Sequence, residues 1–61
     1  MKLEFDPQAD AAYLEILSAE IATTRQLEPG IVIDYDANGN VVGIEVLSIS
    51  KRTDARLLKA A

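Results

Sequence analysis

The chain has 61 residues and a mass of 6.6 kDa, which suffices for one domain, residues 1–61, and not for two. It lacks cysteine and histidine, which excludes disulfides, thiolate metal sites and histidine-based acid–base catalysis. Its 49% hydrophobic and 26% charged residues are typical of a globular protein. No apolar run approaches the ~18 residues of a membrane span, and the N-terminus lacks a signal-peptide apolar region. We therefore expect a soluble, cytoplasmic protein with no membrane partner.

The net charge of −4 is divided unevenly along the chain. Residues 1–50 carry −7, whereas residues 51–61 carry +3. The basic residues of that last segment are Lys51, Arg52, Arg56 and Lys59. A pI near 4.5 argues against nucleic-acid binding, which needs a basic face. We interpret the four cations as a solvated helix face, which is the usual explanation of such a charge run. A role as a nucleic-acid regulator would depend on these four residues alone.

The first half of the chain is predicted to contain three strands, at residues 2–6, 12–17 and 21–27. Residues 2–6 alternate polar and apolar side chains, as a strand half-buried through Leu3 and Phe5 would. Asp6 followed by Pro7 is a helix-start signature, but the strand pattern that follows limits it to a short turn. Residues 18–20 form another turn.

The strongest local signal is a hairpin over residues 31–49. Pro29 and Gly30 break the preceding strand, and Asn38-Gly39 predicts a type I′ turn in which both residues have positive φ. That turn fixes a register in which three apolar pairs share one face: Ile31 with Val46, Ile33 with Ile44, and Tyr35 with Val42. The second strand, extended to Ile49, is apolar on both faces, which indicates that both are partly covered.

After Ser50 the pattern predicts a short helix over residues 53–59, with Leu57 and Leu58 on one side. The expected fold class is therefore α+β, mainly β. It is a small antiparallel sheet of about five strands, containing the 31–49 hairpin, with one short C-terminal helix. Sequential strands are expected to be neighbours. The candidate interface residues are Val41, Leu47, Ile49, Leu57 and Leu58, and the structural turn residues are Pro29, Gly30, Asn38 and Gly39.

One motif matches the EF-hand calcium loop in full, with Asp34, Asp36, Asn38, Gly39 and Glu45 at the required spacing. Pro29 and Gly30 forbid the entering helix that such a loop needs, and both flanks are typical of strands. We interpret the match as an acidic face beside a turn, and we expect no metal site and no cofactor.

The sequence also argues against an enzyme. Asp6, Asp10, Asp34 and Asp36 could supply a carboxylate pair, but so small a domain has little volume for a cleft that would enclose them. Asp6 is better explained as a cap and Asp10 as a charge on an exposed turn. No histidine or nucleophile elbow is present to activate a serine.

Several motifs in order resemble the short prokaryotic domain-of-unknown-function family 2283. They lie at residues 1–6, 9–11, 13–14, 28–31, 34–36 with Gly39, 42–45 and 50–52. The resemblance covers residues 1–52; one departure is Ala12, where the family usually has a larger apolar residue. Some members occur near genes for small toxin-like proteins, so the resemblance implies an antitoxin or partner-protein role.

The expected function is that of a non-enzymatic protein-interaction module. Its partner could be a small basic protein, which an acidic sheet would attract, as an antitoxin does its toxin. The alternative is a small-molecule or metal-binding protein whose site forms between subunits. We also expect a homodimer, because 61 residues without a disulfide or metal make a marginal core.

Overall fold

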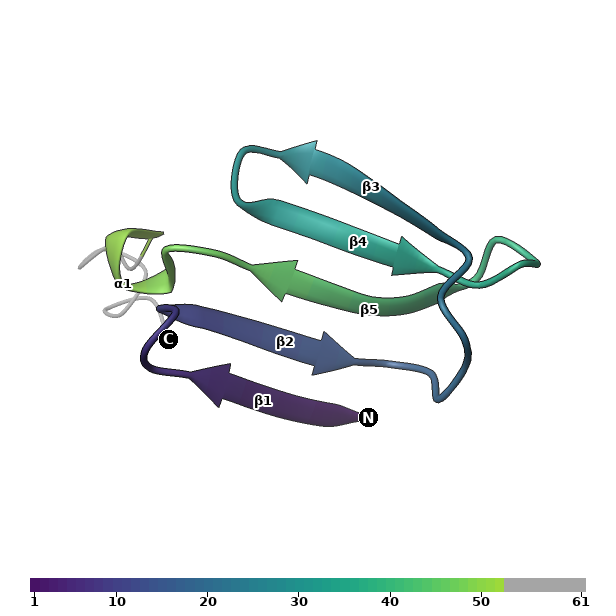
Figure 1. Cartoon of the computed structure of the whole chain (residues 1–61), viewed down its shortest axis with the longest axis horizontal. Helices are drawn as coiled ribbons and strands as arrows, with labels where there is room; N and C mark the ends of the chain where they lie inside the picture. The colour runs from purple at the N-terminus through teal and green to yellow at the C-terminus, as the bar shows by residue number, and fades with distance from the viewer. Residues whose placement is uncertain (53–61) are drawn as a thin grey trace, which may run out of the picture.

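The computed structural model describes residues 1–52 and contains five strands and one short helix (Figure 1). These elements are β1 (Lys2–Asp6), β2 (Ala11–Glu15), β3 (Thr23–Glu28), β4 (Ile31–Tyr35), β5 (Val41–Val46) and α1 (Ile49–Arg52). The predicted mainly-β fold with one short C-terminal helix is confirmed. The helix predicted over residues 53–59, with Leu57 and Leu58, lies outside the described residues; α1 begins earlier, at Ile49.

The strand order across the antiparallel sheet is β1-β2-β5-β4-β3. The expectation that sequential strands are neighbours holds for three pairs and is wrong for β2 and β3, because β2 pairs with β5 instead. Residues 16–22 carry the chain past β5 and β4 to the opposite edge (Figure 1). This order places the most apolar strand at the centre, where Val42 is only 2% exposed.

The hairpin of β4 and β5 confirms two of the three predicted pairs, Ile31 with Val46 and Ile33 with Ile44. Tyr35 pairs with Val41 and not with Val42, because the register shifts between Asp34 and Tyr35. The shift accompanies a longer loop than the predicted two-residue turn: the Asp36 N–H donates to the Asn40 carbonyl over 2.9 Å.

Within this loop Gly39 has a φ of +82°, whereas Asn38 does not adopt positive φ, so the predicted type I′ turn is wrong. The Asp36 carboxylate explains the difference. It accepts the backbone N–H groups of both Asn38 and Asn40 over 2.9 Å, which stabilises a three-residue loop with a single left-handed glycine.

We expect Gly39→Val to lower the free energy of unfolding by about 1–3 kcal/mol, the cost of forcing a β-branched residue into the left-handed region. No atom lies within 4 Å of a Cβ added at Gly39, so backbone strain is the only source of the loss. Urea unfolding measures it. The control is Ala37→Val in the same exposed loop, and equal midpoints for the two variants would contradict the prediction.

Strand β5 ends at Val46, so the predicted extension to Ile49 is wrong: the chain turns at Ser48, which has a φ of +52°, and Ile49 starts α1. Asp10 provides the physical reason. Its carbonyl accepts the Ile49 N–H over 2.9 Å, and its carboxylate accepts the Ser50 N–H and hydroxyl over 3.1 and 2.7 Å. Asp10, expected as an exposed turn charge, therefore caps α1.

Arg52 fixes the other end of α1 to the β3–β4 turn. Its guanidinium donates to the carbonyls of Leu47 and Pro29 and contacts the Glu28 carboxylate at 3.4 Å. Gly30, with a φ of +85°, reverses the chain directly beneath that guanidinium. The short helix thus persists because contacts with two turns hold it, through Asp10 at one end and Arg52 at the other, and not through its own propensity.

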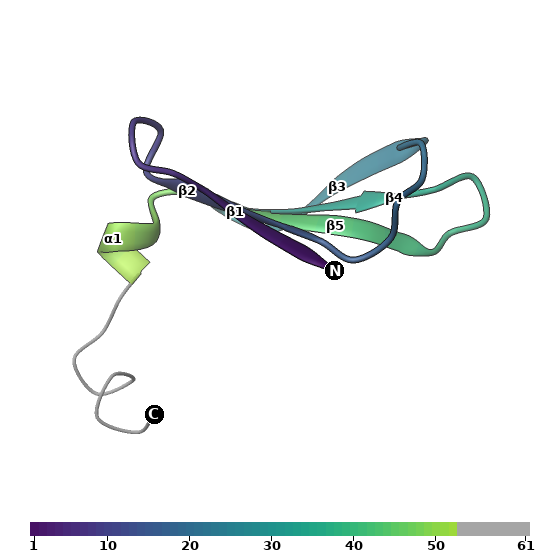
Figure 2. The ribbon, with the colours of Figure 1, turned by 90° about the horizontal axis from the view of Figure 1, so that it is seen from below.

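The strands form a single layer (Figure 2). Among residues 1–52, the only hydrophobic residues that are buried are Ala11 and Val42, 7% and 2% exposed. The molecule therefore has two sheet faces and almost no enclosed core.

No helix in the described part of the chain is long and apolar enough to cross a membrane.

Candidate interaction surface

The register divides the strand side chains into two chemically different faces. Residues directly opposite one another share a face, and the face alternates along each strand. One row across all five strands consists of Leu3, Leu14, Ile44, Ile33 and Arg25. We define the apolar face by this row together with Phe5, Ala12, Thr23, Ile31, Tyr35 and Val46.

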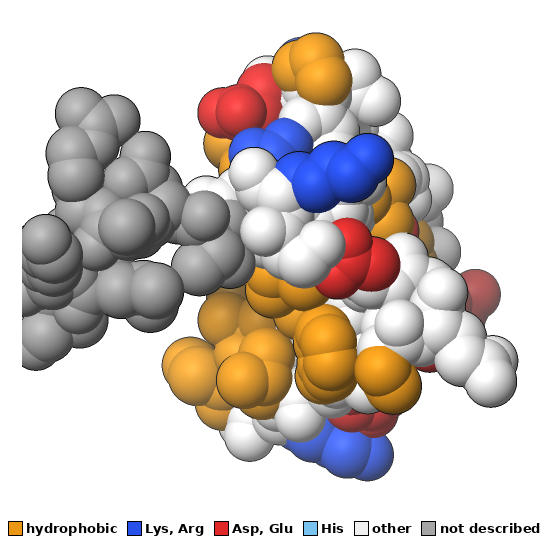
Figure 3. Space-filling model, turned by 90° about the vertical axis from the view of Figure 1, so that its left-hand side faces the viewer, with side chains coloured by type: hydrophobic (Ala, Val, Ile, Leu, Met, Phe, Trp, Pro, Cys, Tyr) orange, Lys and Arg blue, Asp and Glu red, His pale blue; other side chains and the backbone are white. Residues whose placement is uncertain are grey.

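The apolar face is open to solvent over much of its area. Leu3 is 71% and Phe5 58% exposed. The aliphatic side chains of this face on β4 and β5 are only half-buried, namely Ile31, Ile33, Ile44 and Val46. The end view in Figure 3 shows hydrophobic side chains gathered over the lower, β1–β2 part of the molecule, with basic side chains both above and below them. A face of this composition forms the interior when a second layer covers a sheet.

The opposite face, which we call the polar face, carries most of the strand charges. They belong to Lys2, Glu4, Asp6, Glu15, Asp34 and Glu45. Lys2 pairs with Glu4 at 3.1 Å, and both side chains are more than half exposed. Acidic groups outnumber basic ones here, so the polar face is negatively charged.

A hydrogen-bonded bridge crosses the centre of the polar face. The Tyr13 hydroxyl of β2 donates to Asp34 of β4 over 3.1 Å, and the Thr24 hydroxyl of β3 donates to the same carboxylate over 2.7 Å. The Tyr13 ring reaches Asp34 by lying over Gly43 of β5, where an added Cβ would overlap the phenol.

Burial, followed by the hydrogen bond to Asp34 and its negative charge, raises the pKa of Tyr13. The phenol is therefore neutral and acts as a donor near neutral pH. Together with Thr24 and Asp34 it joins three strands across a fourth, which indicates a structural cross-link.

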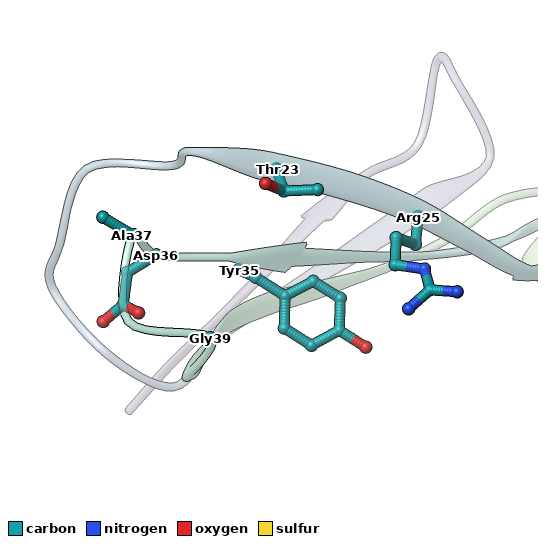
Figure 4. Close-up of a pocket in the computed structure, with 6 residues that line it drawn as sticks. All are labelled: Thr23, Arg25, Tyr35, Asp36, Ala37 and Gly39. Atoms are coloured by element: carbon teal, nitrogen blue, oxygen red, sulfur yellow. The ribbon is translucent and has the colours of Figure 1, made fainter.

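Two adjoining hollows lie at the β3–β4 side of the sheet. One, of about 340 Å³, is lined by Thr23, Arg25, Tyr35, Asp36, Ala37 and Gly39 (Figure 4). The other, of about 330 Å³, shares Arg25 and Tyr35 and adds Gln26, Leu27 and Ile33. Figure 4 shows the Tyr35 ring and the Arg25 side chain on the same side of the ribbon, with the phenol oxygen toward the guanidinium.

The residues predicted as an interface occupy three different places. Val41 starts β5, whereas Leu47 follows its other end, about 20 Å further along at the rise of a strand. Ile49 belongs to α1, and Leu57 and Leu58 lie outside the described residues. The surface that the structure assembles contains Leu3, Phe5, Leu14 and Arg25 instead, which the pairing of β2 with β5 brings into one face.

The acidic residues of the EF-hand match are divided between the polar face and the hairpin loop. Asp34 is bonded to Tyr13 and Thr24, whereas Asp36 is bonded to the loop amides. Both flanks are strands, as the sequence predicted. Within residues 1–52 no group of three or more acidic side chains is arranged to hold a metal ion.

We expect millimolar calcium to leave the amide resonances of Asp34, Asp36, Asn38 and Glu45 unmoved in labelled protein. The reason is that an extended backbone cannot wrap an ion with the roughly six to eight oxygens that calcium requires. Magnesium at the same ionic strength is the control. Saturable shifts at these residues with micromolar affinity for calcium would contradict the prediction.

Comparison with known proteins confirms the family resemblance that the motifs indicated. No curated protein and no solved structure matches the chain. One family model matches residues 2–50, which include all five strands. The chain belongs to the family described as "Protein of unknown function (DUF2283)".

Proposed function

We propose that this chain is a non-enzymatic interaction module that works as a homodimer, with the apolar faces of two copies packed together. The observation that carries the proposal is the apolar face itself. It extends over five strands and leaves Leu3 and Phe5 largely exposed. Two such faces would stack as an aligned β-sandwich, with side chains filling the ~10 Å between the sheets.

The size of the face supports a second copy as the occupant. Five strands about 4.8 Å apart and about 17 Å long give roughly 400 Å² in projection. This lies within the ~300–600 Å² of the largest patch on a monomer, which is often functional. Packing two faces together would remove about 800 Å² of projected area from solvent. Because side chains project from the sheet, the solvent-accessible area buried is larger and comes closer to the ~1,200 Å² of the smallest stable interfaces.

The thin core of the single chain supports the same arrangement. With only Ala11 and Val42 buried among the hydrophobic residues of the described region, one copy gains little from hydrophobic burial. A two-fold dimer gives each copy the second layer that it lacks. Sedimentation equilibrium tests the proposal: we expect twice the chain mass at micromolar concentration, and one chain mass at all concentrations would reject the dimer.

A second partner is favoured by the negative charge of the polar face, which the sandwich would leave outward. Such a face would speed encounter with a small basic protein, in the manner of an antitoxin. The test is binding of a purified basic candidate as a function of salt. We expect affinity to fall with salt and to be lost in Glu45→Lys; salt-independent binding that survives this substitution would reject the polar face as its site.

A further inference from the structure

The hollow at the β3–β4 side presents three hydrogen-bond donors that are not used within the described chain. They are the guanidinium of Arg25 and the hydroxyls of Thr23 and Tyr35. None of these side chains forms a hydrogen bond or an ion pair with any residue in 1–52. A cation flanked by two hydroxyls is complementary to an anion with several acceptor oxygens.

The one carboxylate in the wall is already occupied. Asp36 accepts two backbone N–H groups of the hairpin loop and the side-chain amide of Asn40 at 3.2 Å. The backbone N–H of Asn40 is the largest cause that lowers the pKa of Asp36, so it stays ionised and bonded within its loop. These donors are neutral amides, so Asp36 keeps its negative charge, but within residues 1–52 it forms no ion pair with Arg25. The guanidinium donors of Arg25 are left for another acceptor.

The adjoining hollow adds an apolar wall to the same guanidinium. Leu27 and Ile33 line it together with Arg25 and Tyr35, and Leu27 is 66% exposed. We infer that Thr23, Arg25 and Tyr35 form a binding site for a small organic carboxylate, whose apolar tail lies along Leu27 and Ile33. The planar fork of arginine holds a carboxylate through two parallel hydrogen bonds, which fixes the direction of the tail.

This inference goes beyond the proposed homodimer, because every residue of the site belongs to one copy. Arg25 lies on the edge strand β3, at the rim of the apolar face. A second copy packed on that face would cover the tail and leave the carboxylate near solvent.

The probe is 3-phenylpropionate, titrated into isotopically labelled protein while amide and side-chain resonances are recorded. We expect saturable shifts at Thr23, Arg25 and Tyr35. The uncharged amide of the probe should bind at least about tenfold more weakly, because it loses the charge-assisted hydrogen bonds. Equal binding of acid and amide, or equal binding of inorganic phosphate, would overturn the assignment of a carboxylate with an apolar tail.

Two charge-matched variants separate the site from general attraction. Arg25→Gln should weaken binding by at least about tenfold, whereas Lys51→Gln, which removes the same charge from the surface of α1, should leave it unchanged. If binding of the probe does not saturate by about 10 mM, its affinity is no better than that of nonspecific contact. That result would show that Arg25 serves only as a protective charge on an edge strand. Sedimentation of the same samples keeps the two proposals apart: binding by a monomer rejects only the dimer, and a dimer that does not bind rejects only this site.

Discussion

Gly43→Ala is expected to lower the free energy of unfolding by about 1–3 kcal/mol, as overpacking does at a tightly filled position. The added methyl group would overlap the Tyr13 phenol, and it would also lie 3.0 Å from the Leu14 carbonyl, which the β2–β5 ladder holds in place. The phenol must therefore move away, which breaks its hydrogen bond to Asp34. Chemical unfolding of the two proteins measures the loss.

A double-mutant cycle with Tyr13→Ala shows whether the phenol is the obstacle. In the Tyr13→Ala background, Gly43→Ala should cost much less, because the overlapping ring is gone. The pKa of Tyr13 gives an independent measurement: in Gly43→Ala it should fall toward its ordinary value, since burial and the hydrogen bond to Asp34 are what raise it. Equal costs in both backgrounds, with an unchanged Tyr13 pKa, would contradict this account.

The elements that local chemistry determines could be predicted from the sequence. Alternation located β1, the β-branched runs located β4 and β5, and Pro29-Gly30 and Asn38-Gly39 located both reversals around β4. The pairs near the middle of the hairpin, such as Ile33 with Ile44, are correct because a slip would place Asp34 on the apolar face. The detail of the loop was missed, because Asp36 competes for the amides through its side chain, and dipeptide preferences do not include that contact.

What the sequence did not reveal depends on contacts between distant residues. The insertion of β5 beside β2 leaves no local pattern, and the apolar face spans all five strands only because of that pairing. The same holds for Asp10, whose contacts with Ser50 join segments 40 residues apart. The six apolar residues of the predicted hairpin already indicated one apolar face; its continuation through Leu14 to Leu3 required the strand order.

The role of the apolar face can be isolated with Phe5→Glu, which is expected to weaken the proposed dimer by at least about 100-fold. A two-fold interface would bury the new carboxylate once in each copy, and each unpaired buried charge is costly. Phe5 is 58% exposed in the single chain, so the same substitution should leave the fold of the monomer intact. The measurement is the dimer dissociation constant from sedimentation, with circular dichroism as the check on folding.

The matched control is Gln26→Glu. It adds the same charge on the other edge strand, β3, but on the polar face, because Gln26 pairs with Val32. Since net charge falls by one unit in both variants, a difference between them reports the face and not general repulsion. We expect Gln26→Glu to keep the dimer. Loss of the dimer in both variants would point to charge alone, and retention in both would mean that any dimer forms through an edge, as the unpaired strands β1 and β3 allow.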